Sequence, residues 1–283
     1  MKKVGVVGSG LMGSEIAFVV ASNLDAEVIV RDVSDEALAK GRSIIEKVAG
    51  RAVQKGKATE EQKASWLERV RYTVRMEDLA PCEVVVEAVF ESVDLKRKVF
   101  TELDSICQSA EILASNTSGL PITQIASGTK NRARVVGTHF FNPASIMRLV
   151  EVVRGYETSE ETLKKTQDFC QSIGKETIVS KDYPGFICTR IGQALICEAI
   201  RCLEQGVGSV EDIDKGCRLA YNHPIGPLEL CDLIGLDTEL HVMESFTEEL
   251  GDMFRPSPLM KQMVAAGRLG RKTGQGFYDY TKR

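Results

Sequence analysis

No apolar run in this 283-residue chain approaches the length of about 18 residues that a membrane-spanning helix needs. The N-terminus leads directly into a short apolar segment, from Val4 to Val7, that is typical of a strand. We therefore expect neither a signal peptide nor a membrane anchor, and we expect a cytoplasmic location.

Basic residues are not concentrated in any block large enough to cover one face of the molecule. The chain has 36 basic and 40 acidic side chains and a net charge of -4, and this balance predicts no nucleic-acid partner. The segment 33–57 is the local exception, with six basic residues against three acidic ones. This excess suits a docking surface for a phosphorylated substrate, although a solvated helix face is the simpler interpretation for any single base.

None of the eight cysteines forms a C-x-x-C pair, and several lie within apolar stretches. Their positions are Cys82, Cys107, Cys170, Cys188, Cys197, Cys202, Cys217 and Cys231. In a cytoplasmic chain of this size, we expect them to be small buried hydrophobic side chains. The pattern predicts neither a disulfide framework nor a metal site.

A glycine-rich turn follows the first apolar segment. Gly8-Ser9-Gly10-Leu11-Met12-Gly13 comes directly after Val7 and opens a helical pattern. This order of strand, turn and helix is typical of a dinucleotide-binding site, in which each glycine has a separate reason to be small. Gly8 permits the tight turn, Gly10 lets the backbone approach a pyrophosphate, and Gly13 lets the helix pack closely against the strand.

The helix after this turn is expected to bind the cofactor at its N-terminus, where exposed N–H groups hold an anion. Leu11 and Met12 are therefore predicted to contact the cofactor together with the glycines. Apolar residues recur at helical spacing and predict the buried side of the helix: Met12, Ile16, Val19 and Val20. Ser14 and Glu15 are expected to begin its polar side.

An acidic residue at the end of the next strand supports the dinucleotide site and bears on the choice of cofactor. The segment from Glu27 to Arg31 predicts that strand, and Asp32 follows it, 19 positions after Gly13. A carboxylate there accepts hydrogen bonds from a ribose 2′-hydroxyl and repels a 2′-phosphate, so NAD is favoured over NADP. Arg31 keeps the alternative open, because a guanidinium turned toward the site can hold a phosphate.

Six further short apolar segments predict strands, and helical patterns separate several of them. They are 70–74, 83–88, 112–115, 135–139, 149–153 and 177–180. This alternation predicts a Rossmann-type α/β fold, with a doubly wound, mostly parallel sheet that binds ligands at the carboxyl ends of its strands. A long charged helical excursion, at about 34–69, is expected between the second and third strands.

The pattern changes at Asp182-Tyr183-Pro184-Gly185, where proline and glycine interrupt the chain. Beyond this point no strand pattern recurs. Apolar residues at helical spacing from Ile187 to Leu203 predict a long helix, and several shorter helices follow. We therefore expect a nucleotide-binding domain over 1–183 and a second, all-helical domain over 184–283.

His139 is one of only three histidines, and it ends the predicted strand 135–139. Glu151 lies twelve positions further on in an otherwise apolar strand, where a lone buried charge is expensive. The imidazole of His139 is the economical partner for this carboxylate, whereas His241 is expected on a solvated helix face. A histidine oriented by an acid suits oxidation of a secondary alcohol, since it takes the hydroxyl proton while a hydride leaves for the nicotinamide. A core histidine with satisfied hydrogen bonds is the alternative interpretation.

Several motifs are specific in combination. They are Gly8 to Gly13, Val86-Glu87-Ala88 with Glu91 and Lys96, Ser115-Asn116-Thr117-Ser118, His139-Phe140-Phe141-Asn142-Pro143 with Glu151, Pro184-Gly185-Phe186, the segment from Asn222 to Glu229, and Gly270-Arg271-Lys272-Thr273-Gly274. With these motifs the chain resembles the L-3-hydroxyacyl-CoA dehydrogenase family, most closely its short bacterial members, the 3-hydroxybutyryl-CoA dehydrogenases. The resemblance covers essentially all 283 residues.

The resemblance implies a role for each matched residue. His139 would be the catalytic base, Glu151 its orienting partner, and Ser118 a contact to both the reacting oxygen and the nicotinamide. The residues implied to line the NAD site, besides the glycine turn, are Asp32, Glu91, Lys96, Ser118, Asn142 and Lys272. The residues implied to meet the acyl-CoA substrate are Lys55, Ser118, Asn142 and Thr189. A homodimer through the helical domain is also implied.

One position departs from the family pattern. Family members commonly carry asparagine in a Gly-Phe-x-x-Asn-Arg sequence, where this chain has Thr189 between Cys188 and Arg190. A threonine hydroxyl both donates and accepts, but it is shorter than an amide and offers fewer donors. The departure bears on substrate range and rate and leaves the reaction class unchanged.

Three hypotheses of function follow. The first is NAD-dependent interconversion of a short (3S)-3-hydroxyacyl-CoA and the 3-oxoacyl-CoA. The second is a family relative that acts on longer acyl-CoAs or on a free hydroxy acid. A free hydroxy acid would not need Lys55 and the basic helix. The third is a non-catalytic NAD-binding protein, against which the oriented base at His139 argues.

Overall fold

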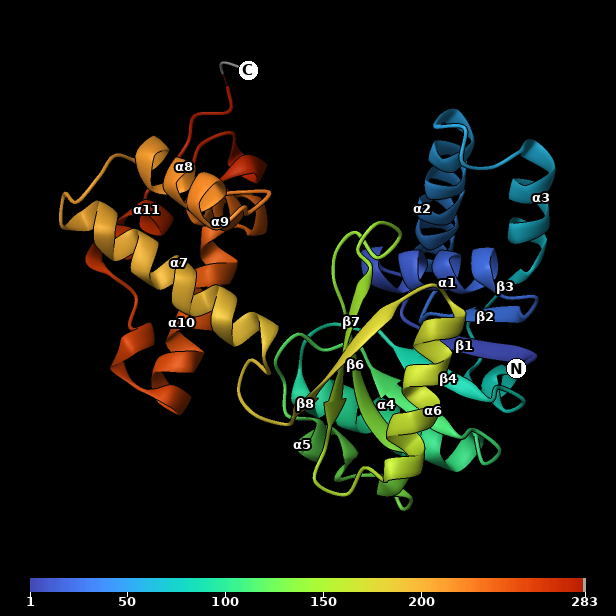
Figure 1. Ribbon diagram of the computed structural model, residues 1–283. Helices are drawn as coiled ribbons and strands as arrows, with labels where there is room; N and C mark the ends of the chain where they lie inside the picture. The colour runs from blue at the N-terminus through green and yellow to red at the C-terminus, as the bar shows by residue number, and fades with distance from the viewer. Residues whose placement is uncertain (282–283) are drawn as a thin grey trace. The chain divides into compact units, whose positions relative to one another are not determined.

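The computed structural model describes residues 1–281 and divides into two compact units, one from Met1 to Phe186 and one that begins at Ile187. The first unit contains an eight-stranded sheet with helices on both faces (Figure 1). The second unit is built from helices. The predicted α/β fold with a doubly wound sheet and a C-terminal helical domain is confirmed.

The strands occupy the segments that the apolar runs predicted. They are β1 (Lys3–Val7), β2 (Glu27–Arg31), β3 (Val70–Thr73), β4 (Val84–Glu87), β5 (Ile112–Ser115), β6 (Val135–Phe140), β7 (Leu149–Arg154) and β8 (Glu176–Lys181). Their order in the sheet is β3-β2-β1-β4-β5-β6-β7-β8. The pair β6–β7 is antiparallel, and the other neighbouring strands run parallel.

Helices cover both faces of the sheet because its strands are apolar on both sides. The helices of the first unit are α1 (Leu11–Asn23), α2 (Asp35–Gln54), α3 (Glu60–Glu68), α4 (Val93–Ile106), α5 (Ile122–Ala126) and α6 (Glu160–Ser172). Side chains of α1, α2 and α6 pack in one core with alternate strand residues such as Val4 and Val6. Side chains of α4 and α5 pack on the other face, against Val7 and Val85 among others.

The helix α1 is buried on nearly all sides, and this contradicts the expected polar side at Ser14 and Glu15. Ser14 is fully buried and Glu15 is only 6% exposed. The Ser14 hydroxyl donates to the carbonyl of Ser9 at 2.8 Å, and the Glu15 carboxylate accepts hydrogen bonds from Ser145. Both polar groups are therefore satisfied inside the fold, which permits their burial.

The predicted helical excursion is confirmed as a hairpin of two helices, α2 and α3, which lie side by side (Figure 1). Ser34 caps α2 by accepting from the N–H of Ala37. Thr59 and Gln62 form a capping box at the start of α3. Hydroxyl side chains thus set where each of these helices begins.

The second unit has its own apolar core. Its helices are α7 (Cys188–Glu204), α8 (Val210–Ala220), α9 (Pro227–Ile234), α10 (Leu236–Leu250) and α11 (Pro258–Ala265). Residues such as Ile196, Leu228 and Phe246 are buried within it. His241 is exposed on α10, as predicted. No helix in the described part of the chain is long and apolar enough to cross a membrane.

The cysteines are free thiols in the described residues. Five of them are buried, as predicted: Cys82, Cys107, Cys170, Cys197 and Cys231. Cys188, Cys202 and Cys217 are partly exposed, so the prediction of burial is wrong for these three. Burial raises the pKa of Cys82 to about 12, which keeps that thiol protonated and unreactive.

Candidate functional site

The strand order reverses between β1 and β4, and the glycine-rich turn lies there, at the carboxyl end of β1. Ligands of open α/β sheets bind at such a switch point. Gly8 has a φ of +98°, and a Cβ atom on it would lie 2.6 Å from the carbonyl oxygen of Ala88. Only glycine fits this turn.

The other two glycines of the turn serve different purposes. A Cβ atom on Gly13 would lie 1.9 Å from the carbonyl oxygen of Gly8, so the close approach of α1 to the turn requires glycine. A Cβ atom on Gly10, the N-cap of α1, would meet no protein atom within 4 Å. The space at the helix N-terminus is therefore open, which suits the pyrophosphate of a dinucleotide. Leu11 is 51% exposed beside this opening, and Met12 is half-buried.

Asp32 follows β2 and is tied to the same turn. Its Oδ2 atom accepts hydrogen bonds from the N–H and the hydroxyl of Ser9, at 2.6 and 2.7 Å. Its Oδ1 atom accepts from the N–H of Val33 at 2.7 Å. Burial alone would raise the pKa of Asp32, but these hydrogen bonds and the charge of Arg31 lower it below its ordinary value. The carboxylate is thus a stable negative charge at neutral pH, as a ribose-binding acid should be.

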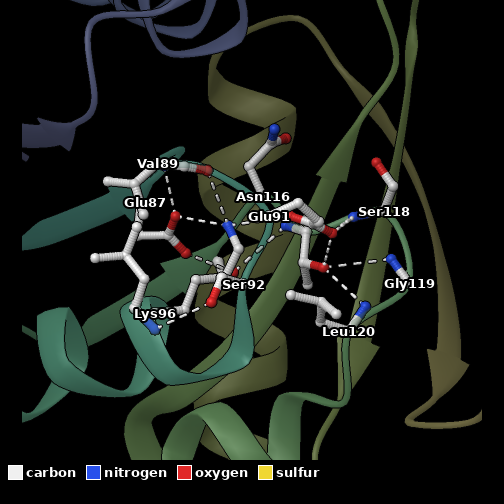
Figure 2. A network of polar contacts seen from close by, with 12 residues as sticks. Glu87, Val89, Glu91, Ser92, Lys96, Asn116, Ser118, Gly119 and Leu120 are labelled. Atoms are coloured by element: carbon white, nitrogen blue, oxygen red, sulfur yellow. Dashed lines mark hydrogen bonds and ion pairs between the residues drawn. The ribbon is translucent and has the colours of Figure 1, made fainter. Parts of the chain in front are cut away.

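A buried ion pair organises the loop after β4. Glu87, the last residue of β4, is fully buried, and Lys96 of α4 is only 1% exposed. The Lys96 Nζ atom lies 2.7 Å from Glu87 Oε1, 3.3 Å from Glu91 Oε2 and 3.3 Å from the carbonyl oxygen of Val89. Figure 2 shows these contacts converging on the loop. Burial raises the pKa of Glu87, and the Lys96 ammonium opposes that rise.

The same network continues into the loop after β5 (Figure 2). The Ser115 hydroxyl donates to Glu87 Oε2 at 2.7 Å. Glu91 Oε1 accepts from the Thr117 hydroxyl at 2.5 Å and from the Ser118 N–H at 3.1 Å. Two loops at the carboxyl edge of the sheet are therefore joined, and Ser118 is held at an exposed position.

His139 and Glu151 lie opposite each other in the antiparallel pair β6–β7. The His139 Nδ1 atom is 3.2 Å from Glu151 Oε2. Glu151 is fully buried and His139 is 6% exposed. An ionised carboxylate only accepts hydrogen bonds, so in this contact Nδ1 is the donor, and Nε2 is the acceptor atom of a neutral ring.

Aromatic rings surround the imidazole. The Phe141 ring centroid is 4.3 Å from that of His139, and the Phe186 centroid is 6.1 Å away. The N–H of Phe140 donates to Asn116 Oδ1 at 3.0 Å, which connects the end of β6 to the loop that carries Ser118. The structure thus gathers His139, Glu151, Ser118, Glu91 and Lys96 at one edge of the sheet.

The remaining predicted site residues occupy other places. Asn142 is exposed three residues after His139, and Lys55 is exposed at the C-terminal end of α2. Thr189 lies in the first turn of α7. Lys272 lies in a short 3₁₀ turn, η4 (Arg271–Thr273), where it forms an ion pair with Asp237 of α10.

Sequence reasoning did not assign a site role to Glu87, although it ends a strand as Asp32 follows one. A search for acidic side chains at the carboxyl ends of the predicted strands would have found Glu87, the last residue but one of the predicted strand 83–88. Ser115 and Thr117 were recognised only as part of a motif. Their contacts to two glutamates from another loop follow from the neighbouring positions of β4 and β5 in the sheet.

Two family models together span nearly the whole chain: 3-hydroxyacyl-CoA dehydrogenase, NAD binding domain, over residues 3–183, and 3-hydroxyacyl-CoA dehydrogenase, C-terminal domain, over residues 185–280. The probable 3-hydroxybutyryl-CoA dehydrogenases of Deinococcus radiodurans and Bacillus subtilis are each 44% identical to it. The first alignment covers 98% of this chain and 100% of the relative, and the second covers 100% and 99%. The solved structure of (S)-3-hydroxybutyryl-CoA dehydrogenase from Ralstonia eutropha matches with a TM-score of 0.94 at 44% identity, over 99% of both chains. The chain therefore belongs to the 3-hydroxyacyl-CoA dehydrogenase family, with NAD as its cofactor.

Proposed function

We propose that this dehydrogenase interconverts a short (3S)-3-hydroxyacyl-CoA, such as 3-hydroxybutyryl-CoA, and the corresponding 3-oxoacyl-CoA, such as acetoacetyl-CoA. The observation that carries the proposal is the buried pair of His139 and Glu151 at the edge of the sheet where the dinucleotide turn lies. The names of the relatives from Deinococcus radiodurans and Ralstonia eutropha support the short acyl chain.

In this proposal His139 is the general base for oxidation. Its Nε2 atom accepts the proton of the 3-hydroxyl group while C3 loses a hydride, which NAD takes up when it is bound. The imidazolium that results is stabilised by Glu151, which stays ionised and holds the ring through Nδ1. In the reverse direction the same imidazolium returns its proton to the ketone oxygen. The Ser118 hydroxyl donates a hydrogen bond to that oxygen in both directions.

The cofactor residues are assigned on the same basis. Gly8, Gly10, Leu11, Met12 and Gly13 form the pyrophosphate turn. Asp32 binds the adenosine ribose. Those assigned to the remainder of NAD are Glu91, Lys96, Ser118, Asn142 and Lys272.

Two residues are assigned to the acyl-CoA. Lys55 is an exposed cation at the end of α2 and suits a phosphate of the CoA. Thr189, with Asn142 and Ser118, would meet the acyl end, and its short hydroxyl in place of an amide would tune chain-length preference and turnover. Binding energy from the CoA handle would position the acyl group for reaction.

The helical unit is proposed to form a homodimer. It exposes several large apolar side chains, among them Leu219 at 75%, Tyr221 at 68% and Ile191 at 66%. Contiguous apolar patches mark surfaces that another protein covers, and these side chains are the candidates for such a patch.

The reaction is tested by mixing the purified protein with acetoacetyl-CoA and NADH and following the loss of reduced nicotinamide absorbance. We expect rapid oxidation by the wild type. His139→Gln should lower kcat by about 10²- to 10⁴-fold, because general base catalysis contributes a factor of that order. His241→Gln, on an exposed face of α10, is the matched control and should match the wild type.

Other outcomes would redirect the assignment. Full activity of His139→Gln would show that another group moves the proton. A wild type that binds NADH but oxidises none of it would rule out acetoacetyl-CoA and turn the search to longer acyl-CoAs and free hydroxy acids.

A further inference from the structure

Two buried charged side chains, Lys175 and Glu15, form hydrogen bonds with the loop between β6 and β7. The Lys175 Nζ atom donates to the carbonyl oxygens of Ala144 and Met147, at 2.6 and 2.8 Å. The Glu15 Oε2 atom accepts from the N–H and the hydroxyl of Ser145, at 2.9 and 3.1 Å. Lys175 is 9% exposed and Glu15 is 6% exposed. Groups of this one loop supply most of the hydrogen bonds to both charges. Burial of an ion costs free energy, so this arrangement indicates that the conformation of the loop matters.

This loop connects the two members of the proposed catalytic pair. It begins two residues after His139 and ends shortly before Glu151. It also carries Asn142, which is assigned above to the NAD site and to the acyl end of the substrate. A change in the loop therefore moves a cofactor contact relative to the base.

Glu15 links the loop to the dinucleotide turn. It lies in α1, two residues after Gly13, and the turn of helix before it is itself anchored by the Ser14 hydroxyl on the Ser9 carbonyl. The carboxylate thus reaches from the helix that would bind the pyrophosphate to the loop that follows the base.

The two charges also support each other. Burial lowers the pKa of Lys175, and the charge of Glu15 opposes that fall. A glutamine at position 15 would remove this support and would leave Ser145 with a neutral amide oxygen as its acceptor in place of a charged one. Glu15 and Lys175 therefore act as a unit with Ser145, and we call these three residues the loop clamp.

We propose that the loop clamp is a positioning device that sets the nicotinamide against the His139–Glu151 pair, so that its effect falls on hydride transfer. The inference rests on the proposed function for the identity of the reaction. It assigns Glu15, Ser145 and Lys175 as positioning residues that touch neither substrate nor cofactor.

The test uses Glu15→Gln, which keeps the side-chain size and removes the charge, and Ser145→Ala, which removes only the hydroxyl. We expect kcat to fall by about 10- to 100-fold, since small displacements of reacting groups have effects of that order. The dissociation constant for NADH and the KM for acetoacetyl-CoA should change little. The melting temperature should fall in Glu15→Gln, because buried Lys175 loses a nearby opposite charge, and should change little in Ser145→Ala. The primary isotope effect with NADH dideuterated at C4 should rise, because hydride transfer becomes the slow step.

Two control variants remove similar groups far from the loop. Thr158→Val removes a buried hydroxyl that donates to the carbonyl of Val135 at 2.6 Å, at the start of β6. Asp104→Asn removes the charge of a carboxylate that pairs with Arg134 at 2.8 Å. Neither should change the isotope effect. The proposal would be overturned if both clamp variants kept the wild-type kcat and isotope effect. It would also be overturned if NADH affinity fell by as large a factor as kcat in both variants and the melting temperature of both fell as well.

A readout without turnover separates this proposal from the assigned reaction. With NADH bound to all three proteins, hydrogen–deuterium exchange of peptides spanning 141–148 should be faster in Glu15→Gln and Ser145→Ala than in the wild type. In Glu15→Gln the Ser145 N–H loses its charged acceptor, and in Ser145→Ala the hydroxyl contact to Glu15 is lost. Unchanged exchange would overturn the clamp even if the enzyme is active. If the wild type oxidises no NADH with acetoacetyl-CoA, faster exchange in the two variants would still support the clamp. Only the proposed substrate would then be contradicted.

Discussion

Asp32 illustrates how local hydrogen bonds keep one carboxylate charged at the dinucleotide turn. Three hydrogen bonds from Ser9 and Val33 hold its carboxylate ionised and oriented at the dinucleotide turn. A fixed negative charge there binds a ribose hydroxyl and repels a 2′-phosphate. Arg31, the residue that left NADP open, contributes its positive charge to lowering the pKa of Asp32. The prediction of NAD is confirmed by the family to which the chain belongs.

Substitution of Lys55 tests whether the substrate is an acyl-CoA or a free hydroxy acid. Lys55→Glu should raise the KM for acetoacetyl-CoA by roughly fivefold at low salt, because reversing an exposed charge near the proposed CoA phosphate costs about 1 kcal/mol. The KM for NADH and kcat should stay the same, and added salt should shrink the effect. Steady-state kinetics at two ionic strengths measure this.

Lys98→Glu provides the control for net charge, since Lys98 is exposed on α4, which packs on the opposite face of the sheet from α2. An equal rise in KM for both variants would mean that Lys55 has no specific contact. An unchanged KM in Lys55→Glu would favour a substrate without CoA.

At the scale of elements, two glycines of the β1–α1 connection should affect different quantities. Gly13 should affect the stability of the fold, and Gly10 should affect the affinity for NADH. Gly13→Ala should destabilise the fold, because its Cβ atom would overlap the Gly8 carbonyl. Gly10→Ala should leave the melting temperature unchanged, since its Cβ atom would meet only open space and its φ of -65° suits alanine. It should still weaken NADH binding by about tenfold or more, since the methyl group disturbs hydrogen bonds worth about 1.5 kcal/mol or more each.

Fluorescence titration with NADH and thermal melting measure these two effects. Gly50→Ala in α2 is a suitable control, because a Cβ atom there meets no protein atom within 4 Å and the position is remote from the turn. Unchanged NADH affinity in Gly10→Ala would show that the pyrophosphate does not lie against this turn.

At the scale of the whole molecule, buried acids hold the helical unit together. Asp214 accepts from two N–H groups in the first turn of α9 and from the Tyr278 hydroxyl. Asp232 accepts from the N–H groups of Phe277 and Tyr278, so the two acids tie the C-terminal segment to the helices. Glu239 is different, because its Oε2 atom is buried with no hydrogen-bond partner among residues 1–281.

Glu239 should make the stability of the molecule depend on pH. Burial raises its pKa from 4.5 to about 7, although a hydrogen bond with Gln193 opposes the rise. The folded state therefore holds the proton more tightly than the unfolded state, and stability is lost as the pH rises from about 4.5 through about 7. The loss is roughly 3 kcal/mol for a shift of this size. Glu239→Gln should remove it, so that the variant is more stable than the wild type at pH 8 and similar at pH 4.

Urea unfolding followed by circular dichroism at several pH values measures the effect. Glu248→Gln changes an exposed acid on the same helix and should leave the pH profile of the wild type intact. Parallel profiles for the wild type and Glu239→Gln would contradict the prediction.

The sequence by itself determined the strands, the glycine turn, the family and the cofactor. Each of these depends on residues close together in the chain: an apolar run of four to six residues, a turn that only glycine fits, or a polar residue at the end of a strand. His139 and Asp32 could be found in this way, because parallel strands bring their carboxyl ends to one edge of the sheet.

Only the tertiary structure decided which polar groups are buried and what they contact. Glu15 was expected on the polar side of its helix, yet it is buried against Ser145, 130 positions away. Glu87 joins Lys96 to Ser115 because β4 and β5 are neighbours in the sheet. Helical and strand periods describe one element at a time, whereas the burial of a charge depends on donors that arrive from distant segments. The physical reason is that a buried ion is stable only where the folded chain supplies its partners.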